Sequence, residues 1–321
     1  CIAVQHLPHR GILCCKPEPA GLMTADHPIV IATFSRRMLL QLPDGECVDA
    51  RIKGKRLKPV VGDRVRAKPM DREQDWLIET IVDRRNALTR PDIRGRTEVL
   101  AANIDLLIAV AAVAPKPDWF VIDRYLNAAE NMGAQAAVVL NKIDLDESQF
   151  VHEQVLAEYE AIGYPTLRCS AETGTNIDRL ASLIDEITAI IVGQSGVGKS
   201  SLINRMVDTA ALRTGSISTK RDEGRHTTVN SVMLELPGGG AVIDSPGVRD
   251  YAPSLQDAEQ VGRGFREIEA LRGDCRFANC RHTREPDCAV KRAVNEAAVS
   301  SRRYDSYKRL LGLTEKLAGH S

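Results

Sequence analysis

The sequence lacks any run of about 18 apolar residues, the length needed to cross a bilayer, and no basic and apolar signal pattern begins it. It also lacks net charge, because 43 basic residues balance 43 acidic ones, and this argues against coating of nucleic acid by bulk charge. The eight cysteines are scattered, which indicates reduced thiols and a possible metal cluster rather than a disulfide framework. These absences predict a soluble, cytoplasmic protein with no membrane partner, and nothing indicates more than a monomer.

The length and the apolar content are sufficient for more than one core. At roughly 150 residues per domain, a chain of 321 residues that is 43% hydrophobic predicts about two domains. The patterns described below give a leader, expected to be mobile, a five-stranded barrel, an α/β nucleotide-binding domain and a helical zinc-binding domain. Their expected bounds are 1–27, 28–90, 97–252 and 253–321.

Short apolar or alternating runs separated by turn residues follow the leader. They predict five strands and hence a small closed barrel of oligonucleotide-binding (OB) type, with an SH3-like barrel as the alternative. The predicted strands are 29–34, 38–42, 47–52, 63–68 and 76–82. Residues 51–68 hold eight basic residues and one acidic residue. This surplus is expected for phosphate contacts, although a solvated face would also explain it.

The segment 84–96 is polar and is broken by Pro91 and Gly95, which predicts a linker. After it, strand-like runs alternate with helix-like runs, and this alternation predicts a parallel sheet with right-handed crossovers. The strands are expected at 105–113, 136–140, 166–170 and 190–192, and the helices at 118–132, 149–162 and 175–186.

The segment 193–200 reads Gly-Gln-Ser-Gly-Val-Gly-Lys-Ser, a complete phosphate-binding loop (P-loop) between a strand and a helix. Its glycines allow successive N–H groups to point at phosphates, Lys199 would bridge the β- and γ-phosphates, and the Ser200 hydroxyl would ligate Mg²⁺. This loop alone leaves ATP, GTP and kinase chemistry open. The residues expected to bind nucleotide here are Gly193, Gln194, Ser195, Gly196, Val197, Gly198, Lys199, Ser200 and Ser201.

Two further segments predict which base is bound. Asn141-Lys142-Ile143-Asp144 follows a buried strand, and a buried Asp144 carboxylate would accept two hydrogen bonds from guanine that adenine cannot donate. Ser170 and Ala171 follow the next strand, where the Ala171 N–H can donate to the guanine oxygen. The two segments together indicate GTP.

The switch residues are expected after the P-loop. Asp244 and Gly247 follow an apolar strand and would supply a carboxylate near Mg²⁺ and an N–H to the γ-phosphate. Either Thr227 or Thr228 would sense the γ-phosphate. Because Val248 occupies the position of the water-orienting glutamine of Ras-like GTPases, His226 is the candidate for that role, and contact with a partner is the alternative. Slow intrinsic hydrolysis that needs an activator follows from this.

The chain order of these motifs is unusual, because Asn141 and Ser170 precede the P-loop and Asp244 comes last. One site can still form if the domain is circularly permuted, which requires only that the original termini lie close together. The second switch would then lead directly into the C-terminal region and transmit movement to it.

The C-terminal region contains a cluster of metal-ligand residues. Cys275, Cys280, His282 and Cys288 form a tetrahedral set suited to structural Zn²⁺, and inert thiols are the alternative. Helices are expected at about 257–271 and 289–316. Residues 263–309 hold twelve basic and seven acidic residues, a surface that suits RNA or an ordinary helical face.

The ordered set of barrel, permuted GTPase motifs and zinc module resembles the family of ribosome-small-subunit-dependent GTPase A (RsgA). The resemblance covers about residues 28–316. It implies a factor that binds the small ribosomal subunit and its rRNA late in assembly, with GTP hydrolysis stimulated by the subunit and coupled to release. Two alternatives stay open: a permuted GTPase with another RNA or ribosome target, and a nucleotide-sensing RNA-binding scaffold with little turnover.

Overall fold

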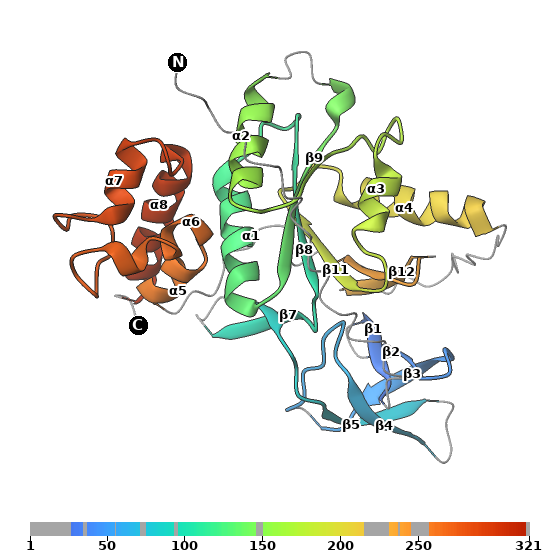
Figure 1. Cartoon of the computed structure of the whole chain (residues 1–321). Helices are drawn as coiled ribbons and strands as arrows, with labels where there is room; N and C mark the ends of the chain where they lie inside the picture. Colours follow the sequence, from blue (N-terminus) through green and yellow to red (C-terminus); the bar gives the residue numbers. More distant parts are fainter. Residues whose placement is uncertain are drawn as a thin grey trace, which may run out of the picture.

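The computed structural model describes residues 27–34, 37–54, 56–70, 75–92, 96–145, 150–214, 231–236, 238–244 and 257–318. It contains a central α/β domain, a barrel before it in the chain and a helical module after it (Figure 1). None of the described helices is long and apolar enough to span a membrane.

The central domain is built on a mainly parallel sheet, as predicted. Its strand order is β10-β9-β8-β11-β13-β12, in which only the last strand, β12, is antiparallel to its neighbour in this domain. The strands are β8 (Leu106–Ala112), β9 (Gln135–Asn141), β10 (Thr166–Arg168), β11 (Thr188–Gly193), β12 (Ser231–Glu235) and β13 (Ala241–Asp244). Every residue of β8 is buried, because helices cover both faces of the sheet.

Helices α1 (Trp119–Met132) and α2 (Phe150–Ala161) pack on one face of this sheet, and α3 (Ile177–Ser182) and α4 (Lys199–Thr214) on the other. A short 3₁₀ helix, η1 (Ile143–Leu145), follows β9. Helix α1 starts at the Asp118 side chain, which accepts the Phe120 N–H, and ends at Gly133, whose φ of +70° suits glycine. Helix α3 is shorter than the predicted 175–186, because the chain turns after Ser182 to enter β11.

The barrel contains β1 (Ile29–Thr33), β2 (Met38–Gln41), β3 (Cys47–Ile52), β4 (Val65–Pro69) and β5 (Trp76–Ile81), close to the five predicted strands. Their order is β1-β2-β3-β5-β4, and two backbone bonds, Val30 N to Asp63 O and Val65 N to Pro28 O, return β4 to β1 and close the barrel. Strand β1 also pairs with β12, so the barrel continues the central sheet. This pairing was not predicted.

The predicted linker at 84–96 is wrong. Strands β6 (Ala87–Pro91) and β7 (Thr97–Ala102) form an antiparallel hairpin within and just after it. Leu88, although surrounded by polar residues, is buried in the core beneath α1 together with Leu100 and Val61. Pro91 is tolerated because it ends its strand in a two-stranded hairpin.

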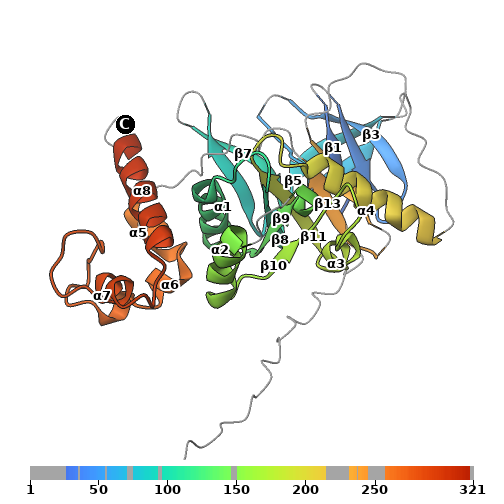
Figure 2. The same cartoon turned by 90° about the horizontal axis from the view of Figure 1, so that it is seen from above.

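The C-terminal module consists of α5 (Ala258–Arg263), α6 (Arg266–Glu269), η3 (Arg272–Asp274), α7 (Ala289–Asn295) and α8 (Ser301–Ala318). Each of the two predicted long helices is interrupted, at Gly264–Phe265 and at 296–300, where Ala297 has a φ of +57°. Val261, Phe265, Ile268, Tyr307 and Leu311 form its core. The module lies beside α1, away from the barrel, in both views (Figures 1 and 2).

Candidate nucleotide site and metal centre

The P-loop lies at the carboxyl end of β11, between β8 and β13, and leads directly into α4. Gly193 has a φ of +147°, and a Cβ atom there would lie 2.2 Å from the Val110 carbonyl oxygen. At Gly198, with a φ of +90°, a Cβ atom would lie 2.4 Å from the Asn141 amide nitrogen. Gly193 is therefore required by the close approach of the β8 backbone, and Gly198 by its positive φ and by the close approach of the buried Asn141 side chain.

Lys199 is held inside this loop. Its Nζ donates to the carbonyl oxygens of Gly193 and Gln194, both at 2.7 Å. Ser195 and Gly196 are exposed at the tip of the loop, and Ser200 and Ser201 are exposed in the first turn of α4, where helical N–H groups favour an anion. The ammonium group and the N-terminus of α4 thus lie together at the P-loop.

Asn141 joins all three nucleotide motifs of the described chain. It is 1% exposed at the end of β9; its Nδ2 donates to Val197 O at 2.9 Å, and its Oδ1 accepts the Ala171 N–H at 3.2 Å. Lys142 adds a second link, because its Nζ donates to Gly196 O at 2.8 Å. The segments that are separated in the sequence therefore meet at one sheet edge.

Asp144 lies in η1, directly after Ile143, and its Oδ1 accepts the hydroxyl proton of the buried Ser170 at 2.5 Å. The expectation that this carboxylate is itself buried is wrong, because Asp144 is exposed. Ser170 orients the carboxylate. Because Asp144 is open to water, an unpaired carboxylate would disfavour adenine only when the bound base itself covers it.

Asp244 ends β13, next to the P-loop strand, at the same edge of the sheet as Ser200. Serine hydroxyl and carboxylate oxygens are ligands that suit Mg²⁺ with a nucleotide, so the residues present fit such an ion. The other predicted switch residues, His226, Thr227, Thr228 and Gly247, lie outside the described residues.

One contact at this site was not predicted. The Gln194 side-chain oxygen accepts the backbone N–H of Asp118, the N-cap residue of α1, at 3.1 Å. The sequence predicted Gln194 only as a nucleotide-binding residue of the P-loop, and Asp118 only as the first residue of a helix. Nothing in the sequence pairs two residues 76 positions apart.

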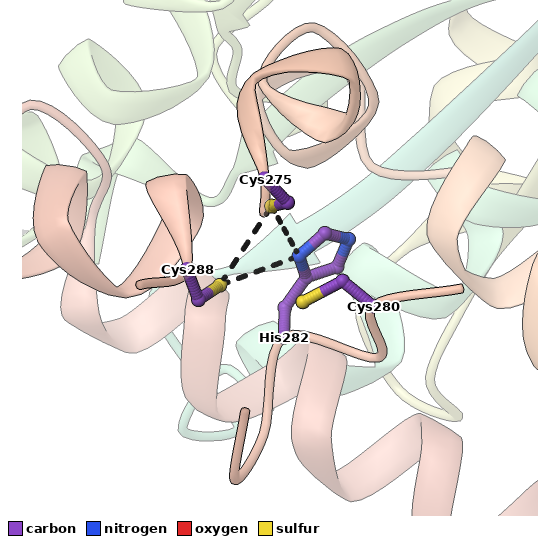
Figure 3. A group of neighbouring side chains, drawn as sticks. All are labelled: Cys275, Cys280, His282 and Cys288. Carbon is purple, nitrogen blue, oxygen red and sulfur yellow. Dashed lines mark hydrogen bonds between the residues drawn. The ribbon is translucent and has the colours of Figure 1, made fainter. Parts of the chain in front are cut away.

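The four predicted metal ligands come together in the C-terminal module (Figure 3). The Nδ1 atom of His282 lies 3.4 Å from the Sγ of Cys275 and 3.5 Å from that of Cys288, and these two sulfur atoms are 3.9 Å apart. The Cys280 sulfur lies within the same group, whose ligand atoms are all within 4.8 Å of one another. A tetrahedral zinc site places sulfurs about 3.8 Å apart and sulfur about 3.5 Å from nitrogen, so this set fits Zn²⁺.

Helix α8 fixes the backbone of the metal-binding loop. The hydroxyl of Tyr304 donates to His282 O at 2.5 Å, and that of Tyr307 donates to Arg281 O at 2.8 Å. Burial lowers the pKa of His282, which favours the neutral imidazole that binds metal, and burial raises the pKa of the Cys280 thiol to about 12. A cation is the group that would compensate thiolates in such a site.

The sheet order and the motif order together define a circularly permuted P-loop GTPase. The RsgA GTPase family matches residues 81–253, more than half of the chain. The chain is 40% identical over 289 residues to the small ribosomal subunit biogenesis GTPase RsgA of Actinobacillus pleuropneumoniae, covering 88% of this chain and 84% of that protein. It is 39% identical over 289 residues to the protein of that name from Haemophilus influenzae, covering 88% and 83%.

Two solved structures are also similar to this chain. YjeQ from Thermotoga maritima matches with a TM-score of 0.71 and 29% identity over 90% of this chain and 98% of that one. YloQ, described as a circularly permuted GTPase, matches with a TM-score of 0.70 and 25% identity over 90% and 95%. The chain belongs to the RsgA GTPase family.

Proposed function

We propose that this protein hydrolyses GTP to GDP and phosphate when stimulated by the small ribosomal subunit, and that it acts late in the assembly of that subunit. The observation that carries the proposal is the double hydrogen bonding of Asn141, which unites the guanine and phosphate motifs of a permuted chain. Relatives whose names state small-subunit biogenesis align over 88% of the chain, a span that is too long to exclude the barrel and the C-terminal module.

The roles of the site residues follow from their chemistry. Asp144 would recognise the guanine N1–H and amine, and the P-loop N–H groups and Lys199 would hold the phosphates. Ser200 and Asp244 would hold Mg²⁺, which supplies charge neutralisation on the phosphates. His226 would position the attacking water, and Thr227 or Thr228 together with Gly247 would sense the γ-phosphate.

We assign a structural role to Zn²⁺ at Cys275, Cys280, His282 and Cys288. Four protein ligands leave no open position for substrate, which is the arrangement of structural rather than catalytic zinc. Metal binding would stabilise a loop that contains little secondary structure between η3 and α7.

Two surfaces are proposed to contact rRNA: the basic side of the barrel and the C-terminal module. On the barrel, part of the charge is neutralised, because Arg51 pairs with Asp75 at 2.7 Å and Lys68 pairs with Glu79 at 2.9 Å. Arg56 and Arg66 are exposed and have no acidic partner among the described residues. They are therefore the stronger candidates for phosphate contacts.

We further propose that the protein acts as a monomer. Its work on the small subunit would take place in the cytoplasm, where bacteria such as those of the relatives assemble ribosomes. The proposal is tested by measuring GTP turnover with no addition, with purified small subunits and with purified large subunits. Stimulation by small subunits alone supports it, and the absence of that stimulation contradicts it.

A further inference from the structure

Helix α1 contacts the nucleotide site at its first turn. The Asp118 N–H donates to Gln194 of the P-loop, and Asp118 in turn caps the helix by accepting the Phe120 N–H. A change in the backbone of the P-loop would therefore act directly on the N-terminus of this helix.

The middle of α1 carries a buried carboxylate that binds two arginines of the C-terminal module. Asp123 is fully buried; its Oδ1 accepts from Arg303 at 2.8 Å and from the Tyr159 hydroxyl at 2.7 Å, while its Oδ2 accepts from Arg302 at 2.9 Å. Arg303 is 1% exposed and also binds both carboxylate oxygens of Glu267 on α6, at 2.8 and 3.0 Å.

Helix α1 contacts the C-terminal module at three more points. The buried Asn127 donates to Val261 O at 2.9 Å, and Arg266 donates to Glu130 at 2.8 Å. The Arg309 guanidinium lies over the Phe120 ring, 3.9 Å from its centre. A side chain at Gly264 would collide with Asn127, which shows how closely α5 approaches the helix. Helix α1 thus contacts the module along its length (Figures 1 and 2). Helix α2 adds Glu158, which accepts from Ser300 and from Arg302, both at 2.8 Å.

The buried charges between α1 and the C-terminal module fix the geometry of the contact more than they add to its stability. Buried charges are costly to desolvate, and a network of them contributes little net stability compared with apolar packing. The network does penalise displacement of the module, because the shift of an arginine would deprive the buried Asp123 carboxylate of a charged partner. Burial lowers the pKa of Arg303, but the nearby Asp123 and Glu267 carboxylates outweigh that effect, and the net pKa is raised, so the guanidinium stays charged.

We propose that α1 is a relay helix, with the Asp123–Arg302–Arg303 cluster as the joint through which nucleotide binding at the P-loop tightens the attachment of the C-terminal module. This inference rests on the proposed GTPase function and assigns a means of regulation to it. The relay is separate from the predicted path through the second switch, whose residues 245–250 lie outside the described residues.

The test is hydrogen exchange of the α8 amides in the full-length protein, with and without Mg²⁺ and a GTP analogue whose β–γ bridge cannot be hydrolysed. The relay predicts that the analogue slows exchange in α8 about fivefold or more. In Arg302→Met, which removes a side chain that is 24% exposed, the analogue binds with near wild-type affinity but the response of α8 is lost. Affinity is retained because the loosened form is a minor population.

The matched control is Lys308→Met. Lys308 lies on the same helix, but its ion pair is with Asp305 and its ring contact is with Tyr304, both within α8. It should respond like the wild type. A second test variant replaces the Asp123–Arg302–Arg303 cluster and Glu267 by apolar side chains, Asp123→Leu, Arg302→Met, Arg303→Met and Glu267→Leu, a change that such networks often tolerate. It should bind the analogue, retain zinc and show no response in α8.

Two results would overturn the relay: bound analogue without slower exchange in wild-type α8, or a wild-type response in both network variants. These results leave the proposed function untouched. Conversely, failure to bind the analogue, or turnover that small subunits do not stimulate, contradicts the proposed function and is detected by separate measurements.

Discussion

The Asn141 side-chain amide donates to the carbonyl oxygen of Val197 at 2.9 Å, although the two residues are 56 positions apart and their order is reversed relative to common GTPases. The bond joins the guanine-recognition segment to the P-loop, and the same side chain reaches Ala171. Circular permutation has therefore rearranged the connections and kept the site, because the strand ends that carry the motifs meet at one edge of the sheet.

Base recognition is tested by Asp144→Asn. The loss of a charged acceptor for the guanine N1–H and amine should weaken GTP binding by about 1.5–3 kcal/mol, or roughly 10- to 150-fold. Xanthine nucleotides should bind relatively better, because the new amide can donate to the oxygen that replaces the guanine amine. Fluorescence competition between the two nucleotides measures both effects. Unchanged preference for GTP would show that Asp144 does not read the base.

The catalytic step is tested by His226→Ala. We expect GTP affinity close to wild type and reduced hydrolysis in the presence of small subunits, because a methyl group cannot position water. Lys199→Ala serves as the contrasting variant and should lose nucleotide binding itself. Single-turnover hydrolysis at saturating GTP separates the two effects. Full stimulated hydrolysis in His226→Ala would eliminate this histidine as the water-positioning group.

The metal centre is tested by Cys288→Ser. Its sulfur lies 3.5 Å from His282 Nδ1, so its replacement should release zinc and expose the loop from 275 to 288 to proteolysis. The matched control is Cys47→Ser, because Cys47 is exposed on the barrel, far from the cluster in the sequence. Zinc content is measured by atomic absorption. Loss of zinc from neither variant, or resistance to proteolysis after chelation, would contradict a structural metal.

A pH prediction follows from Glu285. Although burial acts to raise it, backbone N–H groups of Arg281, Thr283 and Arg284 hold the pKa of this carboxylate at about 2. The pKa of Glu285 in the folded protein lies below its unfolded value of about 4.3. The ionised carboxylate therefore stabilises the folded state fully above about pH 4.3, and this stabilisation is lost as the pH falls through about 2.

Glu285→Gln should therefore lower the melting temperature by an amount that is constant from pH 7 to about 5 and that shrinks as the pH falls further. Glu315→Gln is the control, since its carboxylate pairs with an exposed arginine side chain, a contact that contributes little. A difference that grows in acid would contradict this assignment.

Much of the fold could be predicted from local patterns. Buried runs such as 136–140 and the P-loop between a strand and a helix are visible in any short window of the sequence. The hairpin at 87–102 was missed because the segment 84–96 is mostly polar, and the buried Leu88 in it packs with Leu100 and Ala101 beneath a helix that comes later. The pairing of β1 with β12 was missed because strand partners about 200 positions apart leave no local signal.

The proximity of the described nucleotide motifs, and that of the four metal-ligand residues, could be predicted because each group is compact or follows a strand. The role of α1 could not, since a charged residue in an amphipathic helix is normally taken to be solvent-exposed. A signal was nevertheless present: Asp123, Asn127 and Glu130 recur at helical spacing between apolar residues. Such a polar stripe marks a helix that faces another polar surface. Only the structure identifies that surface as the arginines of α6 and α8.

GTP turnover at saturating nucleotide, titrated with small subunits and in parallel with large subunits, is the most direct test of the central claim. We predict a saturable rise with small subunits, on the order of tenfold or more, because an activator must order a catalytic site that lacks a glutamine after Gly247. Large subunits should leave the rate at its basal value. Equal rates with small subunits, large subunits and buffer would contradict the proposed function.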